Sequence, residues 1–182
     1  TGDWMIQTNN DPTDYLRLNL TNASTDSAAA WNDTAPTATV WSAGDDGAVN
    51  GSGNAYVAYC WHSVDGYSKI GLYTGNGSTD GTFIYTGFRP AFLLLKQKDG
   101  TQDWGIYDNE RFAPFNADAG LGLRPLRPDG NDAEPGAGAG REMDFYSNGF
   151  KLRTSNATFN GNPDPYIYMA FAETPFKYSN AR

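Results

Sequence analysis

The sequence predicts an all-β protein, a two-sheet antiparallel β-sandwich built from two weakly similar halves. The 21 glycines and 10 prolines among 182 residues interrupt the chain too often for long helices. Short apolar or alternating segments lie between turn-forming Gly, Asn, Asp and Pro residues, as a sandwich requires. Similar sequence landmarks also recur about 100–110 residues apart.

The expected strands are short, and their side-chain patterns differ with their place in the sandwich. Leu16, Leu18 and Leu20 alternate with polar residues, which is typical of a strand with one buried face. Residues 91–95 are apolar on both faces and suit a central strand. The expected strands cover approximately residues 3–8, 15–20, 38–42, 55–62, 67–73, 82–87, 91–97, 103–108, 142–146, 149–154 and 165–172.

Turns and irregular segments separate these strands. Residues 75–77 (Gly-Asn-Gly) have turn chemistry, and residues 147–149 (Ser-Asn-Gly) close an expected hairpin. Residues 24–31 are the one helix-like piece, at most two turns long. Residues 45–54 and 125–141 are rich in glycine and are expected to be irregular.

Aromatic residues must supply much of the core, because they make up 14% of a chain that has few aliphatic residues. Each buried ring removes about 150–250 Å² from contact with water. We therefore expect Trp4, Trp104 and one face of residues 56–61 to be buried.

The internal repeat is expected to relate residues 3–62 to residues 103–172 within one domain that spans residues 1–182. An apolar strand precedes the second copy, and no counterpart precedes the first, so we expect a longer parent polypeptide. Four pairs of landmarks carry the repeat: residues 3–6 with 103–106, residues 40–42 with 150–152, residues 50–51 with 160–161, and residues 56–61 with 166–171.

Composition excludes several classes of function. One histidine and one cysteine are too few for an ordinary zinc site or for a disulfide within the chain. A net charge of −8 disfavours nucleic acids and anionic membranes as partners. The longest apolar runs have seven residues, too few to span a bilayer. No glycine-rich phosphate loop is present, so no cofactor is expected.

The residues capable of acid–base chemistry do not form a recognisable catalytic pattern. His62 could act with Ser63 or Asp65, but no nucleophile elbow accompanies it, and a surface histidine is the favoured interpretation. Glu142 and Asp144 match the start of the E-x-D-x-x-E strand of β-glucan hydrolases, but the third position is a serine. We therefore expect no catalytic residues and no enzymatic activity.

Two kinds of binding site are conceivable. Asp45, Asp46 and Asn50 could supply oxygen ligands to Ca²⁺, although their spacing fits no known calcium loop, so no metal is expected. Exposed aromatic rings could stack on sugars, with burial in the core as the alternative for each ring. The candidates for sugar stacking are Trp41, Tyr59, Trp61, Tyr67 and Tyr73.

Distinctive strings occur along most of the chain. They are residues 59–63 (Tyr-Cys-Trp-His-Ser), 66–78, 85–92 (Tyr-Thr-Gly-Phe-Arg-Pro-Ala-Phe), 147–153, 166–173 and 175–182. In combination they resemble a domain that is widespread in the structural proteins of tailed bacteriophages, especially marine ones. In that family the domain commonly lies at the C-terminal end of larger tail or fibre-like proteins, near concanavalin-like jelly-roll modules.

The resemblance implies a concanavalin-like or jelly-roll-like sandwich at the C-terminal end of a longer chain. It implies an extracellular place on the virion surface, contacts with other virion subunits and, by analogy to phage fibres, a homo-oligomer such as a trimer. The expected role is binding of a host surface glycan or receptor, or of a neighbouring virion subunit. A carbohydrate-active enzyme on the same fold and a decoration or fibre subunit without a receptor remain the alternatives.

Overall fold

The chain forms ten short strands and three one-turn helices within the part that the computed structural model describes. The described residues are 2–8, 11–111, 124–131, 133–134 and 140–175. The strands are β1 (Met5–Thr8), β2 (Asp11–Arg17), β3 (Thr25–Asp26), β4 (Ser68–Thr74), β5 (Phe83–Tyr85), β6 (Pro90–Gln97), β7 (Gly105–Asp108), β8 (Met143–Tyr146), β9 (Gly149–Leu152) and β10 (Pro165–Ala172). The helices are α1 (Ala28–Trp31), α2 (Gly47–Asn50) and α3 (Ala157–Asn160). The predicted all-β class is confirmed.

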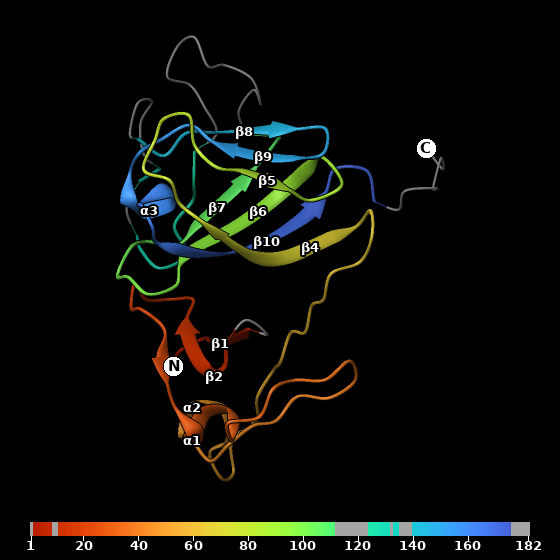
Figure 1. Ribbon diagram of the computed structural model, residues 1–182. Coiled ribbons are helices and arrows are strands. Elements are labelled where there is room, and N and C mark those ends of the chain that lie inside the picture. Colours follow the sequence, from red (N-terminus) through yellow and green to blue (C-terminus); the bar gives the residue numbers. More distant parts are fainter. Residues whose placement is uncertain (1, 9–10, 112–123, 132, 135–139, 176–182) are drawn as a thin grey trace.

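Two antiparallel sheets face each other and make the sandwich (Figure 1). One has the strand order β4-β10-β6-β7, and the other has the order β5-β9-β8. Strand β10 is paired with β4 over residues 165–171 on one edge and with β6 over residues 166–172 on the other. Each strand pair in the sandwich is antiparallel, as predicted.

Aromatic rings fill much of the space between these two sheets. The Tyr73 and Tyr166 rings are stacked with their centroids 4.9 Å apart, and Phe150 meets Tyr73 edge-on at 6.2 Å. The Phe150 ring also meets the Tyr168 ring edge-on at 5.6 Å. Edge-to-face and offset contacts of this kind contribute beyond simple burial of area. The rings thus replace the aliphatic side chains that the composition lacks.

A third sheet, β1-β2-β3, lies beside the sandwich and is joined to it through Trp104 (Figure 1). The Trp104 side chain is buried with Leu16 of β2 and Ile167 of β10. Its indole Nε1 donates to the carbonyl oxygen of Arg17 at 2.9 Å. Trp104 therefore has the buried position that was predicted for it.

Two predicted strands, residues 38–42 and 55–62, are wrong. Neither forms a strand in the structure, and residues 55–62 are exposed along their whole length. Trp4, which was expected in the core, is 55% exposed. For residues 55–62 the physical reason is that no strand of the described chain pairs with their backbone, and the ring that Trp4 stacks on, Tyr59, belongs to this unpaired segment. Residues 37–40 instead form a turn in which the Thr37 amide donates to the Val40 carbonyl oxygen.

Smaller differences concern element bounds. The strand expected at residues 15–20 starts earlier, as β2, and the helix expected at residues 24–31 is reduced to α1 behind the short strand β3. Helices α2 and α3 were not predicted, and α2 lies inside the segment 45–54 that was expected to be irregular. Residues 132 and 135–139 of the predicted irregular segment, and residues 176–182 of the last distinctive string, lie outside the described residues. None of the described helices has the length and apolarity needed to cross a membrane.

Helices α2 and α3 belong to two copies of one turn motif, residues 44–56 and 154–166. In each copy an Asp or Asn side chain caps the helix: Asp46 Oδ1 accepts from Ala48 N at 2.7 Å, and Asn156 Oδ1 accepts from Thr158 N at 2.8 Å. The capping residues have nearly the same backbone angles, with φ and ψ of −62° and 129° in one copy and −68° and 131° in the other. The two copies are 110 residues apart.

A tyrosine hydroxyl closes each copy of the turn motif. The Tyr56 hydroxyl donates to the Gly47 carbonyl and accepts from the Gly51 amide. The Tyr166 hydroxyl makes the equivalent pair of bonds with Ala157 and Gly161. The two copies differ in their surroundings, because Tyr166 is fully buried whereas Tyr56 is 44% exposed. Burial raises the pKa of Tyr166 to about 12.

Lys96 of β6 is a buried cation close to the end of the sandwich. Its side chain is fully buried, and Nζ donates to the carbonyl oxygens of Gln97 at 2.8 Å and of Gly100 at 2.7 Å. Burial lowers the pKa of Lys96 to about 8, although the carboxylates of Asp129 and Asp103 act in the opposite direction. The folded state therefore releases this proton at a lower pH than the unfolded chain does.

Removal of the two tyrosine hydroxyls provides a first test of the packing. Tyr166→Phe should lower the free energy of unfolding by about 1–3 kcal/mol, because the Gly161 amide loses its partner in a buried place. Tyr56→Phe is the matched control and should cost less than about 1 kcal/mol, because water replaces the hydroxyl at an exposed site. Urea unfolding of both variants measures the difference, and equal losses would contradict this account.

The buried lysine predicts an unusual dependence of stability on pH. Between pH 8 and about 9.5 the unfolded chain binds the Lys96 proton more tightly, so the free energy of unfolding should rise with pH, by at most about 1.4 kcal/mol per pH unit. Above about pH 10 the buried tyrosines, whose pKa values burial raises, should reverse the trend. Denaturant unfolding across this range should show the rise in the natural protein and not in Lys96→Met.

Candidate functional site

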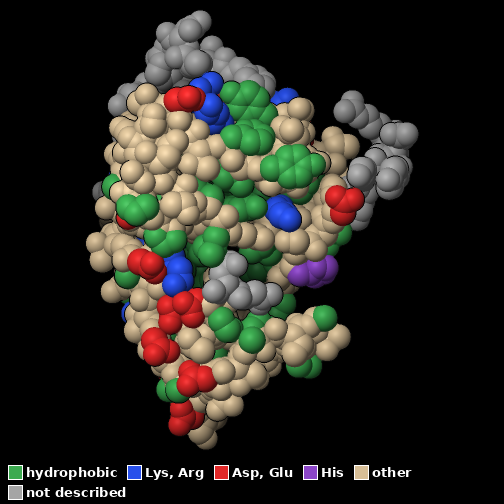
Figure 2. All heavy atoms as spheres, viewed as in Figure 1, with side chains coloured by type: hydrophobic (Ala, Val, Ile, Leu, Met, Phe, Trp, Pro, Cys, Tyr) green, Lys and Arg blue, Asp and Glu red, His purple; other side chains and the backbone are tan. Residues whose placement is uncertain are grey.

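Three aromatic rings form an exposed ladder at the surface of the molecule. We use the term aromatic ladder for Trp4, Tyr59 and Trp61. The Trp4 and Tyr59 rings are stacked with centroids 6.4 Å apart, and the Tyr59 and Trp61 rings are stacked at 5.8 Å. The three side chains are 55%, 62% and 54% exposed, respectively. Figure 2 shows hydrophobic side chains at the surface near the one histidine, which follows Trp61 in the chain.

The backbone on either side of the ladder is held by hydrogen bonds. The Trp4 amide donates to Asn19 Oδ1, and its carbonyl oxygen accepts from the Leu18 amide, both at 3.0 Å. At the other end, Ser68 Oγ donates to the His62 carbonyl oxygen at 2.7 Å. The Tyr56 hydroxyl fixes the start of the segment on the turn motif. The ladder is therefore a surface of three rings whose ends are positioned by the fold.

The ladder suits a ligand with flat apolar faces and polar edges. Residues 55–61 carry no charged side chain, so this segment itself neither attracts nor repels a charged ligand, and the rings offer stacking alone. Aromatic faces bind C–H groups and cations through their negative faces. Three rings in a row match an extended ligand better than a single small molecule. Sugars of a polysaccharide have the required flat faces edged by hydroxyl groups.

The structure separates the predicted sugar-stacking residues into three groups. Tyr59 and Trp61 are brought together in the ladder. Trp41 is 43% exposed and meets the Trp31 ring edge-on at 6.1 Å, and Tyr67 is 37% exposed against Phe171. These two rings are not part of the ladder.

Tyr73 is wrong as a candidate for sugar stacking. Its side chain is only 7% exposed, and its hydroxyl donates to the Phe159 carbonyl oxygen at 2.7 Å. Burial raises the pKa of this hydroxyl well above its usual value. Strand β4 pairs with β10 and turns this side chain into the core cluster between the sheets.

Trp4 is the ladder residue that sequence reasoning missed. It was expected in the core because a chain with few aliphatic residues must use aromatic rings to fill its core, yet only Trp104 of the two Asp-Trp pairs is buried. The contact that makes Trp4 part of the site comes from Tyr59, 55 positions along the chain. No local pattern encodes that contact.

Two of the three candidate calcium ligands, Asp46 and Asn50, have structural roles in the turn motif. Asp46 caps α2, and Asn50 Nδ2 donates to the Gly44 carbonyl oxygen at 2.8 Å. No group of three or more His, Cys, Asp or Glu side chains in the described parts of the chain is arranged to hold a metal ion. The positions of Asp46 and Asn50 are thus explained by the hydrogen bonds of the turn motif.

The candidate acid–base residues are engaged in other ways. Asp144 is buried, and its Oδ2 lies 2.5 Å from Arg153 Nε. Glu142 Oε1 accepts from the Gly140 amide at 3.2 Å. His62 Nδ1 lies 3.0 Å from the carbonyl oxygen of Ser63, whose hydroxyl accepts from the Ile70 amide.

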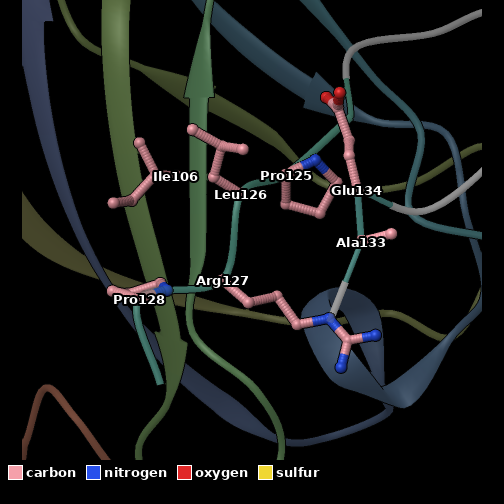
Figure 3. Close-up of a pocket in the computed structure, with 7 residues that line it drawn as sticks. All are labelled: Ile106, Pro125, Leu126, Arg127, Pro128, Ala133 and Glu134. Carbon is pink, nitrogen blue, oxygen red and sulfur yellow. The ribbon is translucent and has the colours of Figure 1, made fainter. Parts of the chain in front are cut away.

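A pocket of about 330 Å³ lies on the sandwich beside β7 (Figure 3). Its two charged residues already have partners: Arg127 pairs with Asp103 at 3.3 Å, and Glu134 pairs with Arg111 at 2.7 Å. None of the predicted site residues lines it. The lining residues are Ile106, Pro125, Leu126, Arg127, Pro128, Ala133 and Glu134.

Comparison with known proteins gives one match. Neither the curated proteins nor the solved structures gave a match to this chain. A family model described as "Domain of unknown function (DUF7483)" matches residues 1–175, which is nearly the whole chain. The chain therefore belongs to the DUF7483 family.

Proposed function

We propose that this chain is a glycan-binding module, without catalytic activity of its own, at the surface of a tailed-bacteriophage virion. The observation that carries the binding function is the aromatic ladder of Trp4, Tyr59 and Trp61, in which three stacked rings are each more than half exposed. Rings of this size are usually buried, and an exposed group of them marks an interaction site.

The ladder favours a polysaccharide over other ligands. Its backbone is fixed at both ends, so little order has to be imposed when a ligand binds. The segment carries no charge in a protein whose net charge is −8, which disfavours polyanions and gives no strong attraction to cations beyond the ring faces. Stacking on a hydroxyl-rich chain needs neither a metal ion nor a deep cavity.

The virion setting is supported by the resemblance of the distinctive strings to tailed-phage structural proteins. Residues 147–153 include the turn between β8 and β9 and the whole of β9, and residues 166–173 include most of the central strand β10. In such a setting the module occurs in many copies, as a homo-oligomer such as a trimer and beside other virion subunits. Repeated copies raise the avidity of weak sites without new contacts.

Substitutions in the ladder test the binding function. A glycan array of bacterial capsular and lipopolysaccharide chains identifies a bound polysaccharide, and titration calorimetry then measures its affinity. Tyr59→Ala and Trp61→Ala should each weaken binding by about tenfold or more, because each removes one stacked ring. Both rings are exposed, so the free energy of unfolding should change little.

Tyr85→Ala is the matched control, because Tyr85 is 65% exposed on β5 and lies outside the ladder. It should leave the affinity unchanged. If the natural protein binds no glycan on the array, or if the ladder variants bind as tightly as the natural protein, the proposed function is wrong. Antibody labelling of intact particles tests the place on the virion separately.

A further inference from the structure

We propose that residues 55–62 form an incomplete β-strand that is completed by two strands of the β4 and β6 kind, which precede residue 1 in the same polypeptide. This stretch is called the open segment below. The proposal concerns the edges and the inner face of the segment. It does not depend on glycan binding by the ladder.

The two turn motifs have the same hydrogen-bond pattern. Besides the capping and tyrosine bonds, the amides of Asn50 and Asn160 each donate to the capping residue four positions earlier, both at 2.8 Å. The side chains of the same two residues donate to Gly44 and Thr154, at 2.8 and 2.7 Å. Every one of these bonds recurs at an offset of 110 residues. We take the two motifs as copies within two related halves of the chain.

The segments that follow the two motifs differ in their strand pairing. Tyr166 leads into β10, which is paired on both edges. Tyr56 leads into the open segment, and within the described residues the main chain of residues 55–61 makes no hydrogen bond. An unpaired, uncharged and apolar stretch of this kind is a ready template for strand pairing.

The side chains on the inner face of β10 are buried, whereas their counterparts on the open segment are not. On β10, Tyr166, Tyr168 and Ala170 point into the core cluster, and Ala170 is fully buried. Their counterparts at the offset of 110 are Tyr56, Ala58 and Cys60, and Cys60 is exposed. The inner face of the open segment therefore lacks the cover that its counterpart has.

The opposite face carries the ladder. Trp104 packs beside Ile167 on the outer face of β10, and Trp4 stacks on Tyr59. The alternation along a strand puts Tyr59 and Trp61 on the face opposite to Cys60. Strand pairing at the edges and cover on the inner face thus leave the ladder accessible.

The surroundings of Asn160 indicate what covers the second motif. Asn160 is fully buried, and its side chain bonds to Asn76 and Ser78 in the turn that follows β4. Asn50 is exposed, and its side chain bonds only within the motif. In the described chain, no turn equivalent to the one after β4 bonds to the Asn50 side chain.

The order of the strands identifies the occupant. The stretch that holds β4, β5 and β6, residues 64–102, directly precedes the Asp-Trp pair at residues 103–104. The equivalent stretch for the first copy precedes the Asp-Trp pair at residues 3–4. A second copy of this chain fits less well, because its β6 is already paired on both edges, so of the strands β4 and β6 only β4 has an edge to offer.

The test uses a graft and the single cysteine as a reporter. A second copy of residues 64–102, which contains no cysteine, is placed directly before Asp3. The Cys60 thiol in the 1–182 chain should react freely with a disulfide reagent. In the grafted chain its reaction should slow by roughly 100-fold, and the amides of residues 55–62 should gain comparable protection from hydrogen exchange.

A matched graft carries Leu93→Pro and Leu95→Pro in the added copy, which removes the strand donors and should leave Cys60 reactive. The polypeptide purified undenatured from its natural source is measured in parallel, and Cys60 should be protected there, so the test does not rely on the graft alone. The proposal is overturned if Cys60 in the natural polypeptide reacts as fast as in the 1–182 chain. It is also overturned if Cys60 of the 1–182 chain becomes protected as its concentration rises, because the occupant is then a second copy.

Discussion

Pairing of β10 on both edges is the constraint on which the rest of the sandwich depends. With β4 on one side and β6 on the other, this strand orders three of the four strands in its sheet. Its side chains alternate between two hydrophobic clusters. Tyr166, Tyr168 and Ala170 pack between the sheets. Ile167 packs with Trp104 and Leu16 on the opposite face of the strand. The third sheet is attached to the sandwich through that second cluster. One strand thus connects all three layers.

The contrast between β10 and residues 55–62 explains how far the sequence could predict the structure. Both segments follow the same turn motif and have similar apolar, aromatic sequences. The prediction for residues 165–172 is correct to the residue, and the prediction for residues 55–62 is wrong. Strand formation depends on neighbouring strands, which supply hydrogen bonds and cover, as much as on the segment itself. A local pattern contains no information on whether those neighbours are present.

The same limit applies to the candidate site. Composition correctly indicated that rings would replace aliphatic side chains in the core. Tyr59 and Trp61, two of the rings named for sugar stacking, are exposed, and their contact with a ligand stays a prediction. Trp4 and Tyr73 were assigned the wrong environments, because an aromatic residue suits a core and a binding surface equally well. The distinction depends on distant residues: Tyr73 is covered by Tyr166 and Phe150, whereas Trp4 meets only the exposed Tyr59 among the rings of the described chain.

The turn motif shows why this chain can present rings on an otherwise uncovered segment. Helix α2 has four residues, too few to be stable alone, yet the Asp46 cap and the Tyr56 hydroxyl satisfy the backbone groups at its two ends. In the buried copy the same bonds are reinforced by packing against the core. In the exposed copy they act alone, and they fix the direction in which residues 55–62 leave the motif. The hydrogen bonds of the turn motif therefore hold the start of the segment in place. Ser68 holds the last residue through the His62 carbonyl oxygen, and Trp4 stacks on Tyr59 between these two ends. Such an arrangement positions rings for a ligand on one face and leaves the backbone edges free to pair.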